Sequence, residues 1–420
     1  MNVSRPVDTA TSAPPPISPL RAALALALLL GLQPITTDLY LPALPTLQRD
    51  LQAPMSAVQL TMSLLLLAFG CAQLLIGPLS DRYGRRPVLL LSLALYSVAS
   101  LGASLAAGIT GLIAMRALQG VGLAGSVVCA RAMVRDLYPP TEGARVLSRG
   151  LSGLGLIAIA GPVLGGLLAA SFGWRATMVA VTASGVLTWL YVWRSLPETA
   201  PALNPQATDW RPLGRTLALI AGHRGFRAWT ALIASTYGGL FVLLAGSSFV
   251  YIGTLGLPPW GYGLAMATAS LSYLLGTVAC RRLLGVHGLA GTVRLGGYFT
   301  LAGGMGMLAL GLGGAQLPAA CLLAGVLLAH CLYTFGHGIH QPCGQASAVG
   351  AFPQAAGVAS ALSGFTLALT AFFVGLWLGQ VLDGSLRAMA VVLAFWSGVT
   401  CTVAWTLVQR DGERFLSRPA

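Results

Sequence analysis

Two charged residues, Asp38 and Arg116, lie deep inside stretches of the chain that are otherwise apolar. An ionisable side chain at such a position is costly in a bilayer and is therefore a candidate functional group. Because an arginine stays charged at any accessible pH, only Asp38 of the two can bind and release a proton. A rise of 1.5 Å per residue places them at similar depths, about 13 Å and about 12 Å from the same surface. The pair predicts proton transfer; a static ion pair that fixes helix packing is the alternative.

A turn after the second apolar stretch is the most specific motif in the chain: GPLSDRYGRRP, residues 77–87. Its first glycine is expected to permit close helix approach and its second a tight turn. The acid between them can cap or pair at helix ends, and the arginines can hold an anionic leaflet and helix C-termini. An ordinary basic loop would explain the arginines but not the glycine and aspartate framing. The residues assigned to this turn are Gly77, Asp81, Arg82, Gly84, Arg85 and Arg86.

A glycine-rich segment in the fifth apolar stretch, residues 153–166, predicts tight helix packing. Pro162 leaves a backbone carbonyl without its helical partner, and Gly161, Gly165 and Gly166 allow another helix to approach closely. Polar and aromatic side chains of the spans are candidates for the lining of a substrate cavity, although each alone is more commonly an anchor or packing residue. They are Gln33, Tyr40, Gln119, Tyr237, Tyr251 and Tyr273.

Three histidines, His330, His337 and His340, fall near one helical face and could bind a metal or a proton. We favour solvated histidines, because a span over 317–340 would place His337 and His340 at its exit. The seven cysteines form no CxxC pair and are interpreted as small buried apolar residues, so we expect neither a metal site nor a disulfide frame. The segment GVGLAG (120–125) matches a dinucleotide-binding pattern, but no strand precedes it, so it favours helix packing.

The elements that position these residues are membrane helices. Of the 420 residues 8% are charged, against about a quarter in soluble domains, which excludes a water-soluble enzyme and a disordered chain. All 24 basic residues are arginines, and the absence of lysine removes P-loop ATPase and lysine Schiff-base chemistry. The arginines lie in short loops between apolar runs, so we expect no nucleic-acid partner.

Twelve apolar runs are long enough to cross the hydrocarbon core of a bilayer as helices. Twenty arginines lie on one side of this layout and three on the other, which predicts that both termini are cytoplasmic. The runs are approximately 20–46, 57–79, 87–106, 108–132, 146–171, 175–194, 227–252, 259–281, 290–313, 317–340, 355–381 and 386–408. The predicted units are a disordered cytoplasmic tail (1–19), a six-helix bundle (20–194), a cytoplasmic linker (195–226) with a surface helix near 212–221, a second six-helix bundle (227–408) and a cytoplasmic tail (409–420).

Three segments, GPLSDRYGRRP, RALQG (116–120) and AGPVLGG (160–166), resemble the signatures of drug:proton antiporters of the major facilitator superfamily. Segments 36–47, 246–263 and 352–365 resemble its bicyclomycin/chloramphenicol-resistance branch, Bcr/CflA. The resemblance implies an all-α membrane protein with the major facilitator fold, twelve transmembrane helices in two pseudo-symmetric bundles, and alternating access. It also implies export of small organic compounds against proton influx across a bacterial inner membrane, with no cofactor.

By position, the resemblance assigns Asp38 as the first-helix acid, Arg116 as the fourth-helix arginine and Asp81 as the gating-turn acid. Some relatives carry a second first-helix acid where this chain has Leu29 and Leu30, so we expect neutral or weakly polar substrates. An exporter or importer dedicated to one metabolite, such as a nucleoside or sugar, is the alternative. An intramembrane enzyme is not favoured, because the chain has no GxSxG or HExxH motif. We expect a monomer in the lipid bilayer.

Overall fold

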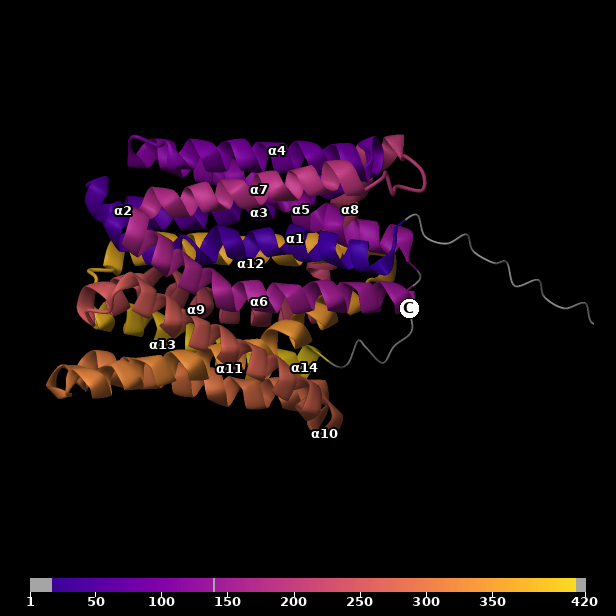
Figure 1. Ribbon diagram of the computed structural model, residues 1–420. Helices are drawn as coiled ribbons and strands as arrows, with labels where there is room; N and C mark the ends of the chain where they lie inside the picture. Colours follow the sequence, from indigo (N-terminus) through magenta and orange to yellow (C-terminus); the bar gives the residue numbers. More distant parts are fainter. Residues whose placement is uncertain (1–16, 139, 413–420) are drawn as a thin grey trace, which may run out of the picture.

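The structure is a computed structural model that describes residues 17–138 and 140–412, without some of the side chains between 140 and 155. Most of both predicted tails therefore lies outside the described residues. The described chain is helical and contains no strand (Figure 1). We call the end of the bundle that carries α8 (Trp210–Gly222) the linker end, and the end that carries α2 (Leu44–Asp50) the far end.

The first half of the chain forms a bundle whose first helix is interrupted near the far end. Helix α1 ends at Asp38, and prolines at 42 and 45 occupy the second positions of the two short helices that follow, within the first turn, where a missing N–H costs little. The elements of this half are α1 (Pro19–Asp38), η1 (Leu41–Ala43), α2 (Leu44–Asp50), α3 (Met55–Tyr83), α4 (Arg85–Ser104), α5 (Ile109–Leu137), α6 (Pro140–Phe172) and α7 (Trp174–Ser195).

The second half follows the linker, in which α8 lies where a surface helix was expected. Gly288 has a positive φ of 64° and divides α10 into two limbs, 259–287 and 289–313. The elements are η2 (Pro205–Thr208), α8, α9 (Arg224–Ser248), η3 (Phe249–Thr254, a π-helix), α10 (Pro259–Gly313), η4 (Gly314–Gln316), α11 (Ala319–Gly350), η5 (Pro353–Ala355), α12 (Ala356–Val381), α13 (Leu386–Thr402), η6 (Val403–Leu407, a π-helix) and α14 (Val408–Asp411).

The helices match the twelve predicted crossings. Among the described residues, ten helices are long and apolar enough to span a membrane. One of them, Pro259–Gln316, contains both limbs of α10, and α6 adds the apolar segment Leu156–Phe172. Large apolar side chains such as Leu91, Val98 and Leu105 are exposed on the outside of the bundle, as lipid-facing residues are.

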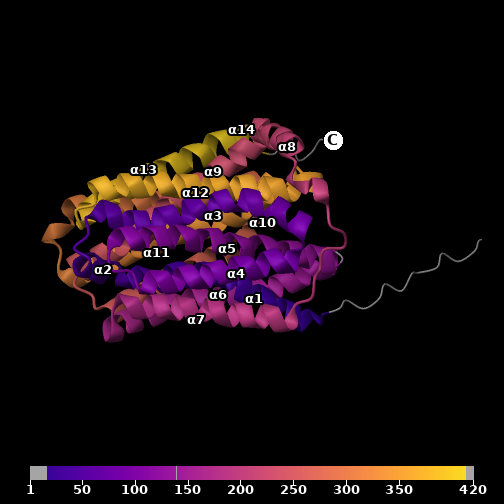
Figure 2. The same ribbon diagram turned by 90° about the horizontal axis from the view of Figure 1, so that it is seen from above.

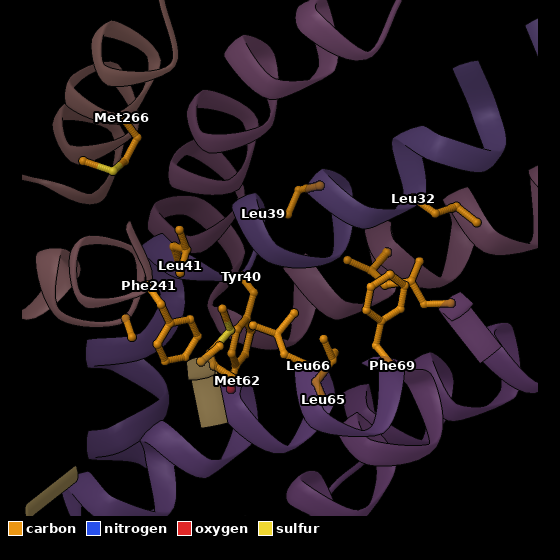
Figure 3. Packing of buried hydrophobic residues seen from close by; sticks show 14 of the residues in the cluster. Leu32, Leu39, Tyr40, Leu41, Met62, Leu65, Leu66, Phe69, Phe241 and Met266 are labelled. Atoms are coloured by element: carbon orange, nitrogen blue, oxygen red, sulfur yellow. The ribbon is translucent and has the colours of Figure 1, made fainter. Parts of the chain in front are cut away.

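The two halves share a hydrophobic core at the far end. Figure 3 shows Phe241 of α9 close to Tyr40 and Met62 of the first half, and these residues belong to one buried cluster. A second buried cluster, at the linker end, contains only residues of the second half, from Ile220 to Val408. The halves are therefore packed together at the far end, while the core of the second half is separate at the linker end.

Two helix pairs carry the contact between the halves. Helix α3 lies along α12 (Figure 2). Helix α6 lies along the first limb of α10. At the far end, the Gln59 side-chain amide donates a hydrogen bond to the backbone carbonyl of Ala245, 2.9 Å away and buried. At the linker end, an exposed contact of 3.4 Å joins Arg131 to the Ser360 hydroxyl. The contacts between the halves are thus tighter at the far end.

Candidate functional site

Asp38 is the last residue of α1 and lies beside α6. Its side chain is half-buried, and the Thr37 hydroxyl donates a 2.9 Å hydrogen bond to its Oδ1 atom. A Cβ atom on Gly161 would lie 3.2 Å from the Asp38 Cβ, so the absent side chain leaves room for the acid. The predicted acid and the Gly161–Pro162 segment are therefore brought together.

Two tyrosines of the second half lie within electrostatic range of the Asp38 carboxyl. Tyr237 is on α9 and Tyr262 is on α10, and both phenols are close enough to the carboxyl for an electrostatic interaction. Tyr262 also precedes Gly263, where a Cβ would lie 2.5 Å from the Pro162 carbonyl oxygen of α6. The Tyr262 hydroxyl is 2.9 Å from the Ser247 hydroxyl. Tyr262 was missed by the sequence analysis, although it lies in the segment 246–263 that carries the family resemblance. Asp38 therefore lies where the two halves meet.

Arg116 is fully buried within the first half and is held by neutral groups. Its guanidinium lies over the Tyr40 ring, 4.3 Å from the centroid, and donates to the Gln119 carboxamide oxygen at 2.6 Å. It also donates to the backbone carbonyls of Thr36 and Thr61, at 3.4 and 3.3 Å. Carbonyl dipoles and an aromatic face thus stabilise the buried charge.

The expected face-to-face arrangement of Asp38 and Arg116 is wrong for this structure. Among the described residues no ion pair joins them. Arg116 contacts the Thr36 carbonyl in the last turn of α1 and the Tyr40 ring two residues beyond its end, four residues further along the chain. Asp38 follows Thr36 by two residues, which is about 200° around the helix at 3.6 residues per turn. The two charges lie on opposite sides of the first helix.

The six predicted cavity residues divide into two groups. Gln33, Tyr237 and Tyr273 are half-buried, so they remain candidates for a lining. The other three are fully buried and already bonded, which corrects the prediction for them in this conformation. These three are Tyr40, Gln119 and Tyr251. Tyr40 and Gln119 contact Arg116, and the Gln119 amide also donates to the Ser100 hydroxyl. The Tyr251 hydroxyl is 3.4 Å from His330 Nδ1.

The arginines of the 77–87 turn bind within the first half and the linker. Arg85 forms ion pairs with Asp81 and with Asp136 of α5, the second at 3.0 Å. Arg86 donates to the carbonyls of Trp193 and Leu196 at the C-terminal end of α7, both at 2.8 Å. The Arg82 guanidinium donates to the Thr208 hydroxyl at 2.5 Å. The turn therefore ties α3, α4, α5 and α7 to the linker.

Glu198 in the linker caps the N-terminus of α4, a role that the sequence analysis missed. Its carboxylate accepts backbone N–H bonds from Arg85 and Arg86, at 2.9 and 3.1 Å, and from Thr199 and Ala200, both at 2.9 Å. Partial burial opposes ionisation, but these four donors outweigh it and lower the pKa of the Glu198 carboxyl. The sequence signal was weak, because the acid lies 113 residues from Arg85.

The two glycines of the turn, Gly77 and Gly84, differ in whether the structure requires glycine at that position. Gly84 has a φ of 97°, and a Cβ there would lie 2.6 Å from Glu198 Oε2, so both its backbone and its surroundings require glycine. The close helix approach expected at Gly77 is wrong here, because a Cβ at this position would meet nothing within 4 Å.

The glycines after Pro162 allow backbones to touch. A Cβ on Gly165 would lie 2.7 Å from the backbone of Leu39 in the first half. A Cβ on Gly166 would lie 2.3 Å from the carbonyl oxygen of Pro259, across the contact with α10. One face of α6 therefore packs on α1 and on the second half, next to Asp38.

The expectation of solvated histidines is wrong. Helix α11 continues through Pro342 to Gly350, so His337 and His340 lie inside the helix and are buried, as is His330. His337 Nδ1 is 3.2 Å from the Thr236 hydroxyl, and His340 Nε2 donates to the Val293 carbonyl at 3.1 Å. In the part of the chain that the structure describes, no cluster of three metal-binding side chains occurs.

Comparison with known proteins places the chain in a family. The model of the Major Facilitator Superfamily matches residues 26–375. The chain is 31% identical to a chloramphenicol resistance protein of Pseudomonas aeruginosa over 63% of its own length and 62% of that protein. It is 33% identical to multidrug resistance protein D of Escherichia coli K12, over 56% and 58% of the two chains. It is 28% identical to a bicyclomycin resistance protein homolog of Haemophilus influenzae, over 57% and 60%.

These matches span about three fifths of the relatives' length, and their names support the branch that the motifs indicated. Among solved structures, a D-xylose–proton symporter is similar with a TM-score of 0.75 and 18% identity, over 93% of this chain and 97% of that one. That likeness bears on the fold, which agrees with the predicted two bundles of six helices. The chain belongs to the Major Facilitator Superfamily.

Proposed function

We propose that this chain is a proton-coupled exporter of small organic compounds, drugs among them, that works by alternating access between its two halves. Relatives named for resistance to chloramphenicol, to bicyclomycin and to multiple drugs support the export of such compounds. The observation that carries the proposal is Asp38. It is a half-buried carboxyl with no cation within ion-pair distance among the described residues, and it lies where both halves meet.

Asp38 is the proton carrier in this proposal. When the far end opens, the carboxyl takes up a proton and the substrate leaves. When the linker end opens, the carboxyl loses the proton and substrate binds again between the halves. Because Asp38 lies beside Gly161 of α6 and acts on Tyr262 of α10, a rocking motion of the halves changes its surroundings. Burial disfavours the charged carboxylate, so such a change moves the proton.

We propose that the linker end faces the cytoplasm of a bacterium and that the protein lies in its inner membrane, with both termini inside. Three arginines lie at the far end, Arg49, Arg175 and Arg387, whereas the turn and linker arginines gather at the other end. The far end is the more tightly packed one, so we assign this conformation to the cytoplasm-facing part of the cycle.

Arg116 has a supporting role in this proposal, because it binds the face of α1 opposite Asp38 and so fixes the helix that carries the acid. The turn at 77–87 fixes the linker ends of four helices of the first half. In this proposal the protein acts as a monomer and catalyses no chemical conversion. It needs no cofactor, because the proton gradient supplies the driving force.

Transport in proteoliposomes tests the proton coupling. With chloramphenicol as the probe substrate, the wild type should alkalinise the lumen when substrate is added outside, because substrate entry is exchanged for protons, and Asp38→Asn should abolish this movement. Asp383→Asn is the matched control, since Asp383 is an exposed acid at the far end. Uphill transport by Asp38→Asn at the wild-type rate would contradict the carrier role.

A susceptibility panel in an efflux-deficient bacterium tests the breadth of the substrates. An exporter of drugs should raise the tolerated concentration of several unrelated compounds, and Asp38→Asn should remove that protection. A transporter dedicated to one metabolite would protect against none of them, which would overturn the proposed substrate class.

A further inference from the structure

Two cysteines of the second half touch inside the bundle. Cys280 lies in the first limb of α10 and Cys343 in α11, and their sulfur atoms are 3.3 Å apart. Both side chains are buried, 2% and 3% exposed. The sulfurs need to approach by little more than 1 Å to reach the disulfide bond length of about 2.05 Å.

The backbones of α10 and α11 come unusually close one turn away. A Cβ on Gly338 would lie 2.3 Å from the Tyr273 carbonyl oxygen and 3.2 Å from the Gly276 Cα. Cys280 follows Gly276 by one helical turn, and Cys343 follows Gly338 by slightly more. A disulfide needs Cα atoms within roughly 4.4–6.8 Å, which two helices in backbone contact can provide. Arg281 and Arg282 follow directly and are exposed, so the pair lies near the aqueous boundary at the linker end.

We propose that Cys280 and Cys343 form a dithiol site that a peroxide oxidises to a disulfide in the folded protein, and that this disulfide leaves transport intact. Hydrogen peroxide first oxidises one thiol to a sulfenic acid and is itself reduced to water. The second thiol then attacks the sulfenic sulfur, the S–S bond forms, and the hydroxyl leaves as a second water. Each sulfur loses one hydrogen, and the two electrons go to the peroxide.

The tolerance of the disulfide follows from its place in the fold and rests on the proposed alternating access. Both cysteines belong to the second half, so a rocking motion between the halves does not change the distance between them. The contact of Ser56 with Gly379 is the opposite case, because it joins α3 to α12 across the far end, and a Cβ on Gly379 would lie 3.3 Å from the Ser56 Cβ. A disulfide there would hold the halves together.

Mass spectrometry of the purified full-length protein tests whether the bond forms. After treatment with hydrogen peroxide, the peptides with Cys280 and Cys343 should be found cross-linked, with two hydrogens lost, and dithiothreitol should reverse this. Cys280→Ser should prevent the cross-link. Thiols of Cys280 and Cys343 that both remain free to maleimide after oxidation and denaturation would overturn the proposal, and so would a bridge to a different cysteine.

Transport in proteoliposomes tests whether the bond is tolerated. Oxidised wild type should transport the chloramphenicol probe within about twofold of the reduced protein. The control is Ser56→Cys with Gly379→Cys in a Cys280→Ser, Cys343→Ser background, which should lose transport on oxidation and regain it on reduction. Reversible loss of transport in the oxidised wild type would overturn the tolerance. Absence of transport in the reduced wild type would instead count against the proposed function, and the mass result would stand.

Discussion

At the scale of single residues, the first half contains a buried cation without a carboxylate partner among the described residues. The donors of Arg116 go to carbonyl oxygens of Thr36, Thr61 and Gln119, and its planar face lies over the Tyr40 ring. These contacts come from α1, α3 and α5, so the side chain joins three helices. A lysine would place a compact ammonium group there, which cannot donate hydrogen bonds to three separated carbonyl oxygens as the planar guanidinium does.

We therefore expect Arg116→Lys to lower the free energy of unfolding by about 2 kcal/mol or more, since each lost hydrogen bond to a charged group is worth about 1.5–3 kcal/mol. The number of protons moved per substrate should stay unchanged. Thermal unfolding in detergent and proteoliposome transport measure the two quantities, with Arg49→Lys, an exposed far-end arginine, as the control. A wild-type melting temperature with an altered proton ratio would show instead that Arg116 acts on the Asp38 proton.

That Asp38 and Arg116 lie at the same level along the bundle could be predicted by counting residues. Their positions around the first helix could not, because those depend on which helices pack against it. The spacing along the chain places Thr36 and Tyr40 on one face and Asp38 on another. Which face meets Arg116 depends on packing among helices distant in the sequence. For the same reason Tyr262 and Glu198 were missed, since each acts on a residue more than a hundred positions away.

At the scale of elements, the first turn of α4 depends on a linker carboxylate. Because the pKa of Glu198 is lowered in the folded protein, the unfolded chain binds more protons, and this stabilisation is present above the usual pKa of about 4.5. It is lost as the pH falls through the lower value of the folded state. A lost N-terminal cap costs about 1 kcal/mol.

Glu198→Gln should therefore unfold at a lower temperature than the wild type at neutral pH, and the two should converge as the pH falls below about 4.5. Thermal unfolding against pH measures this difference. Asp209→Asn, which alters an exposed linker acid with no side-chain cap bond, should follow the wild type at every pH. A constant difference between Glu198→Gln and the wild type down to acidic pH would contradict the charged cap.

The glycine face of α6 should set how tightly the far end closes. Gly166→Ala places a methyl group against the Pro259 carbonyl, and overpacking of this kind costs about 1–3 kcal/mol. Labelling of a Gln59→Cys reporter by an impermeant maleimide should then rise at least roughly fivefold. Gly77→Ala is the matched control, because its methyl group would meet nothing within 4 Å. Equal labelling in both variants would show that α6 and α10 do not limit far-end opening.

Helix boundaries were predicted less well where a proline lies inside a membrane helix. The predicted span 317–340 stops just before Pro342, yet α11 continues to Gly350 and buries His337 and His340. Neighbouring helices accommodate the carbonyl that such a proline frees. By contrast, the break in α10 at Gly288 falls between two predicted spans. The glycine with positive φ lies in the same charged segment that separates the two apolar runs in the sequence.

At the scale of the whole molecule, twelve crossings in two bundles follow from hydropathy and arginine placement, because a bilayer permits few alternatives. The end at which the halves close could not be predicted. It depends on whether buried residues such as Phe241 and Met62 join one cluster, and both conformations of an alternating-access protein use the same sequence. The exact bounds of the two predicted bundles stay a prediction.

The most direct test of the account is the proton that accompanies substrate binding. Purified protein in weakly buffered detergent solution is titrated with the chloramphenicol probe while a pH indicator records protons and intrinsic fluorescence records binding. The account predicts that the wild type releases a proton as substrate binds, and that Asp38→Asn binds substrate without releasing any. Equal proton release by the wild type and Asp38→Asn would contradict it.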